Sequence, residues 1–214
     1  MAEYALTVKQ PWTDLVMVRT DDGGCLKPVE NRCWPVPSTL PQRWECETCG
    51  DRFEERDHWN DENCGPLADA GPFPFRLWIH AGQQVVNPLD AGEAWQALMD
   101  HLELRPNAML AYVHGRLGVL LGSVTVTGCH HSDECYPTGH WVDGCTCAGP
   151  FGMGIGMQHE PGCGLEPWCS PWSEPNAWHW TLTDPQPLAT PIPVRGRQKL
   201  WTLPDDIAVE AAHA

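Results

Sequence analysis

The chain has 214 residues and a formal net charge of −15 at pH 7, and 42% of its residues are hydrophobic, including twelve tryptophans. This apolar content excludes a disordered chain, and the length fits one folded domain with insertions. An acidic chain of this kind does not hold a nucleic-acid backbone by general electrostatic attraction.

The first predicted elements are a strand at 4–8 and a helix that starts at Pro11. Proline suits the first helical position, and Trp12, Leu15 and Val16 then recur at helical spacing. Alternating or continuous apolar residues predict further strands at 29–34 and 76–81.

A second helix is expected between Asp90 and Leu102, because Asp90 and Glu93 form a capping box and Pro106 ends the apolar stripe. Three more strands are predicted after it, at 117–127, 178–183 and 199–203. These elements indicate an α+β protein built on a small, mostly antiparallel β-barrel with one or two flanking helices.

Two segments interrupt this single domain, 35–74 and 129–169, and each separates two predicted strands. They carry net charges of −6 and −5 and hold nine of the eleven cysteines. Connections in compact domains usually have about 4 to 6 residues, so segments of this length need stabilisation of their own. The N-terminus has no signal-peptide pattern and no run of about 18 apolar residues occurs, so we expect a soluble cytoplasmic protein without a membrane partner. Reduced cysteines in that compartment favour metal binding over disulfides.

The first segment predicts a structural zinc site formed by Cys46, Cys49, His58 and Cys64. A C-x-x-C turn followed by glycine, then one histidine and one further cysteine, supplies the tetrahedral ligand set that zinc prefers. Four protein ligands leave no open position, so this zinc is not expected to be catalytic. The alternative is a redox C-x-x-C pair, which would require a thioredoxin-like βαβ context that the pattern does not show.

The second segment offers more ligands than one zinc can use, namely Cys129, His130, His131, Cys135, His140, Cys145, Cys147, His159, Cys163 and Cys169. The preferred set for a second zinc is Cys135, Cys145, Cys147 and Cys163, with Cys129 and Cys169 as alternative ligands at the two ends of the segment. In the other interpretation some of these cysteines are simply buried thiols.

Several motifs outside the two segments occur in a recognisable order: Lys9-Gln10-Pro11-Trp12, a K-x-x-E-x-R element formed by Lys27, Glu30 and Arg32, Leu77-Trp78-Ile79-His80-Ala81, Ser170-Pro171-Trp172, and Gly196-Arg197-Gln198-Lys199-Leu200-Trp201. Together they resemble an ASCH domain of the PUA-like superfamily. One departure is Cys25, which stands where the family usually has a glycine.

The resemblance implies a β-barrel with a cleft beside the K-x-x-E-x-R strand that binds RNA, a nucleotide or a modified base. Some ASCH proteins are hydrolases, either amidohydrolases acting on N4-acetylcytidine or ribonucleases. If this chain is an enzyme, the resemblance makes Lys27 and Glu30 its catalytic residues, although the amidohydrolases have threonine at the position of Glu30. The candidate ligand-binding residues are Lys9, Trp12, Lys27, Glu30, Arg32, Trp34 and Trp172.

The chemistry of these residues supports the same reading independently. A lysine, a carboxylate and a guanidinium can read donors and acceptors on a base edge, and tryptophans offer stacking faces. Their alternative role is a structural ion-pair network with tryptophans packed in the core, and His80 and His179 are expected to be hydrogen-bonded structural histidines.

Three functions therefore remain as hypotheses. The first is a binding module for RNA, a nucleotide or a modified base, and the second is a hydrolase acting on a modified nucleoside or RNA. The third is an interaction module whose acidic, zinc-stabilised segments contact a basic protein partner.

Overall fold

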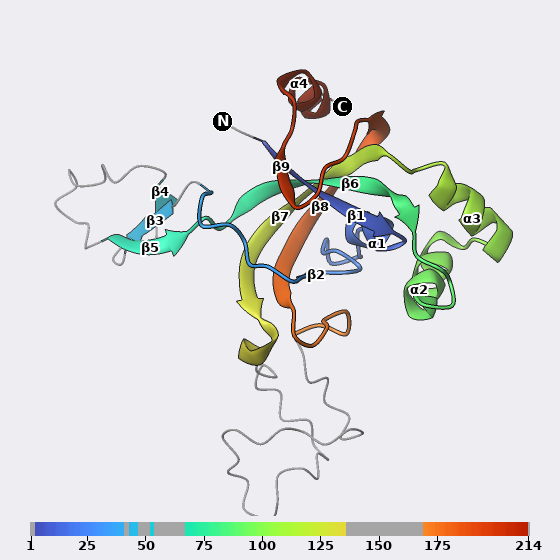
Figure 1. The fold of residues 1–214 in the computed structure, drawn as a ribbon, viewed down its shortest axis with the longest axis horizontal. Helices are drawn as coiled ribbons and strands as arrows, with labels where there is room; N and C mark the ends of the chain where they lie inside the picture. Colours follow the sequence, from blue (N-terminus) through green and yellow to red (C-terminus); the bar gives the residue numbers. More distant parts are fainter. Residues whose placement is uncertain (1–2, 41–42, 47–51, 54–66, 136–168, 214) are drawn as a thin grey trace, which may run out of the picture.

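The computed structural model describes residues 3–40, 43–46, 52–53, 67–135 and 169–213, which form an α+β fold around one six-stranded sheet (Figure 1). The strand order is β2-β8-β7-β6-β1-β9. Only β1 and β6 run parallel, and the other neighbours pair antiparallel. The predicted α+β class with a mostly antiparallel sheet is confirmed.

Each strand predicted from the alternating pattern is present in this sheet. The bounds are β1 Tyr4–Gln10, β2 Val29–Arg32, β6 Phe75–Val85, β7 Val119–His131, β8 Trp178–Pro193 and β9 Leu200–Thr202. β7 continues past residue 129, so the segment predicted as an insertion begins inside a strand. β8 is longer than the predicted strand at 178–183, because the part after residue 183 contains four prolines, which lack the N–H group of a strand ladder and so do not predict a strand. The register of β8 with β7 shifts in three places.

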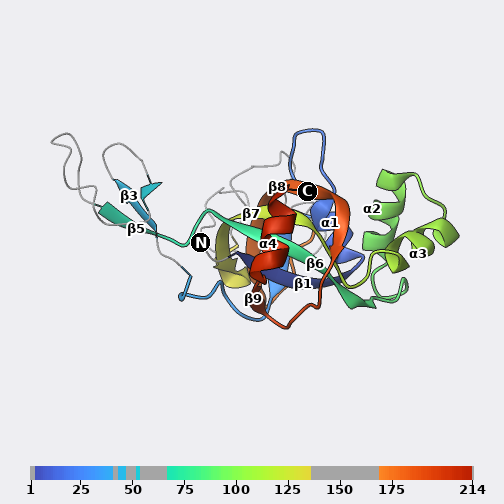
Figure 2. The same cartoon turned by 90° about the horizontal axis from the view of Figure 1, so that it is seen from above.

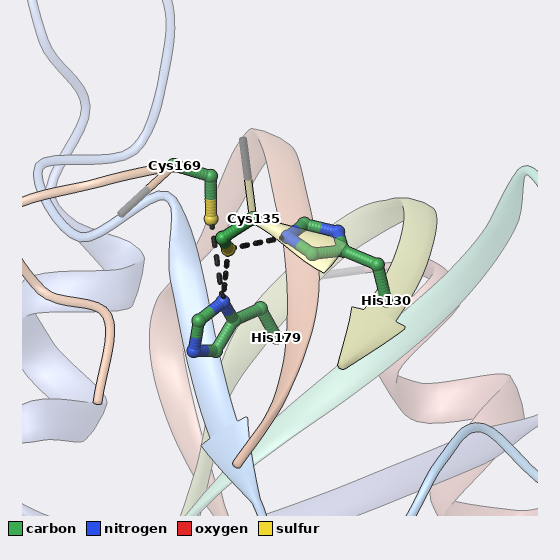
Figure 3. Close-up of side chains that lie close together, drawn as sticks. All are labelled: His130, Cys135, Cys169 and His179. Atoms are coloured by element: carbon green, nitrogen blue, oxygen red, sulfur yellow. Dashed lines mark hydrogen bonds between the residues drawn. The ribbon is translucent and has the colours of Figure 1, made fainter. Parts of the chain in front are cut away.

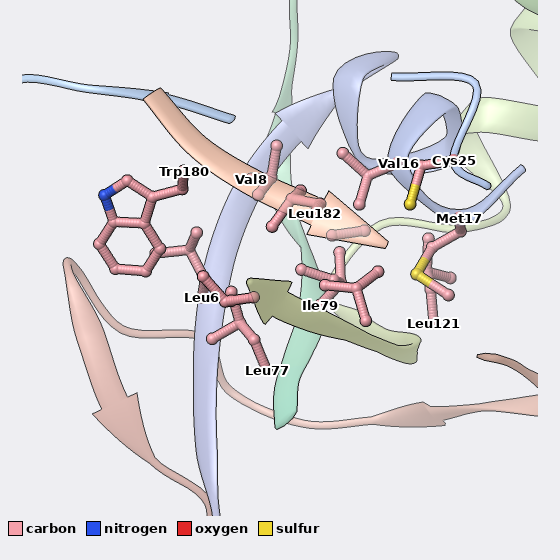
Figure 4. Close-up of a cluster of buried hydrophobic side chains, with 13 residues drawn as sticks. Leu6, Val8, Val16, Met17, Cys25, Leu77, Ile79, Leu121, Trp180 and Leu182 are labelled. Atoms are coloured by element: carbon pink, nitrogen blue, oxygen red, sulfur yellow. The ribbon is translucent and has the colours of Figure 1, made fainter. Parts of the chain in front are cut away.

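One face of the sheet is covered by a hydrophobic cluster that we call the inner core (Figure 4). Alternate residues of four strands supply it, namely Leu6, Val8, Leu77, Ile79, Ala81, Leu121, Val124, Val126, Trp180 and Leu182. Helix α1, Trp12–Met17, adds Val16 and Met17 to the same cluster. The period-2 pattern of the sequence thus determines which face of each strand is buried.

The helices differ from the prediction more than the strands do. Helix α2, Gly92–Leu102, is present, but its N-cap is Ala91 and no side chain caps it, so the predicted capping box is wrong. Pro106, expected only to end that helix, begins helix α3, Pro106–His114, where its missing N–H has no cost. The pattern also missed helix α4, Asp205–His213.

The first inserted segment contains a small sheet of its own, which lies to one side of the main sheet in Figure 2. Its strands are β3 Arg43–Cys46, β4 Arg52–Phe53 and β5 Leu67–Gly71, paired in the order β4-β3-β5. The sequence pattern predicted no strand here.

β2 and β9 form the two edges of the main sheet, and no ladder joins them among the described strands. The described sheet is therefore open, and it does not show the predicted closed barrel. A side-chain hydrogen bond links edge strand β2 to β1, the neighbour of the other edge strand: Arg32 on β2 donates from Nη2 to the carbonyl oxygen of Thr7, 3.3 Å away. Within the described part of the chain, no helix is both long enough and apolar enough to span a membrane.

Candidate metal centre and ion-pair network

Four side chains of metal-ligating type meet where β7 ends at His131 and β8 begins at Trp178 (Figure 3). His130 lies on β7 directly opposite His179 on β8. Cys135 follows the short 3₁₀ turn Ser132–Glu134, and Cys169 begins the loop that leads into β8. Their ligand atoms all lie within 4.8 Å of one another. We call these four residues the His/Cys cluster.

The separations within the cluster fit one tetrahedral ion. The Cys135 sulfur lies 3.0 Å from His130 Nε2 and 2.9 Å from His179 Nδ1, and the Cys169 sulfur lies 3.5 Å from His179 Nδ1. Zinc bonds of about 2.0 to 2.3 Å at tetrahedral angles place ligand atoms about 3.3 to 3.8 Å apart. Small side-chain movements would therefore bring all four atoms into the coordination shell of one metal ion.

Two further groups orient the ligands of the cluster. His179 is fully buried and donates from Nε2 to the carbonyl oxygen of Glu174, 2.8 Å away, so Nδ1 is the ring nitrogen directed at the thiols. The Ser173 hydroxyl lies 3.2 Å from the Cys169 sulfur. Such outer contacts fix the tautomer and position of metal ligands.

Burial affects the two kinds of ligand in the cluster in opposite ways, because it disfavours the thiolate of cysteine but favours the neutral imidazole of histidine. Burial is the largest cause of the pKa of the Cys135 thiol being raised to about 11. Burial, and then His179, lower the pKa of His130, which favours the neutral imidazole that binds metals. A bound metal ion would favour the thiolate, so metal binding here releases thiol protons.

Most of the predicted metal ligands lie outside the residues that the structure describes. In the first site, Cys49, His58 and Cys64 lie outside them, and for Cys46 only the backbone is described, so that site stays a prediction. In the second site, Cys145, Cys147 and Cys163 also lie outside. Cys135 is described, and it meets Cys169, one of the two alternative ligands, and His130, another candidate ligand of that segment. The fourth member, His179, lies outside the segment. The other alternative, Cys129, is not part of the cluster and packs against the inner core.

A second polar group lies on β2 and in the turn before it. Glu30 joins two cations, with Lys27 Nζ 2.8 Å from one carboxylate oxygen and Arg32 Nη2 2.8 Å from the other. Lys27 also donates to the carbonyl oxygen of Val29. Burial alone would raise the pKa of Glu30, but the charges of Lys27 and Arg32 outweigh burial and lower it. We call these three charged residues the β2 network.

Two of the predicted aromatic residues gather around the β2 network. Lys27 Nζ lies 5.7 Å from the ring centroid of Trp12, and the rings of Trp12 and Trp172 meet edge to face at 5.9 Å. Trp172 donates from its indole nitrogen to the carbonyl oxygen of Leu26, and its own carbonyl oxygen accepts from the Asn31 amide. Trp172 is therefore held over the turn that carries Lys27.

The other two predicted ligand-binding residues lie apart from this group. Trp34 packs edge to face on Trp180 of the inner core, with ring centroids 4.9 Å apart. Lys9 is exposed near the end of β1. The structure thus brings Trp12, Lys27 and Trp172 together with Glu30 and Arg32, but not with Trp34.

The His/Cys cluster and the β2 network are connected through one short segment, 169–174. This segment supplies the ligand Cys169, the two outer groups Ser173 and Glu174, and between them Trp172. Asn31, next to Glu30, accepts from the Glu174 backbone N–H as well as donating to Trp172. An ion in the cluster would therefore fix the loop that covers Lys27.

His179 is the candidate metal ligand that sequence reasoning missed, because it lies outside the segment 129–169. The alternation Trp178-His179-Trp180 indicates that its side chain lies opposite the buried tryptophans, but the strand pairing that places it against His130 is a long-range property. No protein-family model matches the chain, and a comparison with curated proteins finds no match either.

Proposed function

We propose that this protein is a zinc-stabilised binding protein of the ASCH type, which holds RNA, a nucleotide or a modified base beside Trp172 and the β2 network. Two thiolates and two imidazoles form a Cys₂His₂ set, which neutralises Zn²⁺ and leaves no open position. The zinc in this proposal is structural.

The observation that carries the proposal is the position of Trp172. Its loop contains one ligand of the His/Cys cluster, and its ring meets Trp12, which in turn faces the Lys27 ammonium. Indole rings beside a cation are suited to a planar, electron-rich base, and stacking of this kind contributes about 1 to 3 kcal/mol per base. The acidic chain favours a small or single-stranded ligand over a duplex.

Binding is better supported than catalysis by the same residues. Lys27 is 3% exposed and Glu30 is 6% exposed, and each is already engaged by the other. A nucleophilic or basic lysine needs a free amine that can reach its substrate. The hydrolase with Lys27 and Glu30 as catalytic residues, and the basic protein partner of the acidic segments, have no comparable observation in their favour.

Calorimetric titration of nucleosides and short single-stranded oligonucleotides tests the proposed function. Trp172→Ala should abolish detectable binding, whereas Trp172→Phe, which keeps a stacking face, should retain most of it. Lys27→Ala should weaken binding as well, with its fold checked by circular dichroism. If the wild type binds none of these ligands, or binds them as tightly after Trp172→Ala, the proposed function is wrong.

A further inference from the structure

A cavity of about 920 Å³ lies on the face of the main sheet opposite the inner core. Thr7 on β1 alternates with Leu6 and Val8, and His80 on β6 alternates with Ile79, so both point away from that core. The other wall is the segment 194–198, which connects β8 to β9 (Figure 1). The cavity is lined by Thr7, His80, Gly82, Gln83, Val194, Arg195, Gly196, Arg197, Gln198, Trp201 and Pro204.

The charge of this cavity is opposite to the charge of the chain. Arg195 and Arg197 line it and are both exposed, and the lining contains no aspartate or glutamate, although the chain carries a net charge of −15. Lys27 and Arg32, in contrast, already share Glu30. Neither cavity arginine has an ion-pair partner among the described residues.

The segment that carries the two arginines is fixed against the sheet. His80 donates from Nε2 to the carbonyl oxygen of Val194, 3.0 Å away. A Cβ atom at Gly196 would lie 2.3 Å from the His80 ring and 2.9 Å from the Thr7 hydroxyl, so only glycine allows this close approach. Arg195 and Arg197 flank that contact point and are therefore held at the wall of the cavity.

We propose that this cavity binds a phosphate monoester of nucleotide size. Guanidinium groups form paired, charge-assisted hydrogen bonds with phosphate oxygens. The volume lies within the range of about 300 to 1,000 Å³ typical of small-molecule sites. The amides of Gln83 and Gln198 supply donors and acceptors for the sugar hydroxyls of such a ligand.

This site does not depend on the proposed function. Glu30 pairs in register with Trp180, whose side chain belongs to the inner core, so the β2 network and the cavity lie on opposite faces of the sheet. Trp172→Ala should leave the cavity intact, and loss of the cavity arginines should leave the Trp172 site intact. An experiment can therefore contradict one proposal without contradicting the other.

The test is calorimetric titration of the full-length protein with adenosine 5′-monophosphate, ribose 5-phosphate, inorganic phosphate and adenosine. The variant is Arg195→Gln/Arg197→Gln, in which both altered side chains are exposed. The matched control is Arg19→Gln/Arg105→Gln, which removes the same charge from two exposed arginines outside the cavity lining. All titrations are also made with Trp172→Ala.

The two phosphate esters should bind, with affinity that falls as salt is added, and the cavity variant should lose at least about tenfold in affinity. Ribose 5-phosphate, which has no base to stack on Trp172, should bind the control variant and Trp172→Ala as tightly as it binds the wild type. Absence of ester binding, equal binding by the cavity and control variants, or inorganic phosphate binding as tightly as the esters would each overturn the proposal. Binding of adenosine lost only in Trp172→Ala would support the proposed function and would not support this site.

Discussion

The His/Cys cluster and the β2 network lie at neighbouring ends of paired strands, but they obtain their partners from different sources. In the β2 network the chain supplies both signs of charge, and Glu30 joins Lys27 and Arg32. In the His/Cys cluster two thiols and two imidazoles face one another, and the cation must come from solution. Losing one member of the β2 network should therefore always cost stability, whereas losing one cysteine of the cluster should cost stability only when metal is present.

The largest expected effect is in the β2 network. Glu30→Gln leaves two cations, one of them almost fully buried, without a counter-charge, and breaking a buried pair in this way costs about 3 to 5 kcal/mol. Urea denaturation should show this loss both with zinc and with a chelator. The control is Glu93→Gln on the exposed side of α2, which should stay within about 0.5 kcal/mol of the wild type. Equal stability of the two variants would contradict the account of Glu30.

A smaller effect, dependent on metal, is expected for the cluster. Cys169→Ser should lower the free energy of unfolding by about 3 kcal/mol when free zinc is about 100 times the dissociation constant. In excess chelator the wild type and Cys169→Ser should be equally stable, because neither then holds an ion there. Cys33→Ser, at an exposed cysteine outside the cluster, is the matched control and should change nothing in either condition. If Cys169→Ser lowers the free energy of unfolding by the same amount in chelator, the cysteine stabilises the fold through packing and not through a metal ion.

The pH dependence of stability should separate Glu30 from another buried carboxylate. The lowered pKa of Glu30 means that its contribution is present above the ordinary glutamate range and is lost as the pH falls through the lowered value. Burial raises the pKa of Asp14 despite the nearby Arg116, so its protonated form is favoured, and that contribution is lost as the pH rises.

Unfolding free energies measured in chelator between about pH 3 and pH 7, a range that includes the ordinary pKa values of carboxyl groups, check this difference. Glu30→Gln should flatten the acid loss of stability, whereas Asp14→Asn should not. A wild-type slope that Glu30→Gln leaves unchanged would show that Glu30 is not the group responsible.

The smallest expected effect concerns the outer groups of the cluster. Ser173→Ala removes the hydroxyl beside the Cys169 sulfur and should weaken zinc binding by about 10- to 100-fold. Competition with a chromophoric chelator measures this affinity, and Ser123→Ala, on β7 outside the cluster, serves as the control. Unchanged affinity in Ser173→Ala would limit the metal site to its four ligands.

The six strands could be predicted from the sequence because alternation is a local property that survives in the fold. Leu77 and Ile79 face the inner core while Trp78 and His80 face away, as the period-2 pattern requires. The helix boundaries were less predictable, since Pro106 ends one helical pattern and starts the next, and the caps of α2 come from backbone geometry.

The candidate sites were only partly predictable, because their members come from distant parts of the chain. The K-x-x-E-x-R spacing placed Lys27, Glu30 and Arg32 together correctly, since they belong to one strand and the turn before it. The His/Cys cluster depends on the pairing of β7 with β8, in which His131 lies opposite Trp178, and no local pattern contains a pairing between such distant residues. The arginine cavity likewise appears only once the segment after β8 lies over His80.

The most direct test of the metal centre is the zinc content of the purified protein, measured by elemental mass spectrometry on the wild type, Cys169→Ser and Cys33→Ser. The account predicts that Cys169→Ser holds one zinc ion per chain fewer than the wild type, while Cys33→Ser holds the same number. Equal zinc content in all three proteins would show that the His/Cys cluster does not bind zinc.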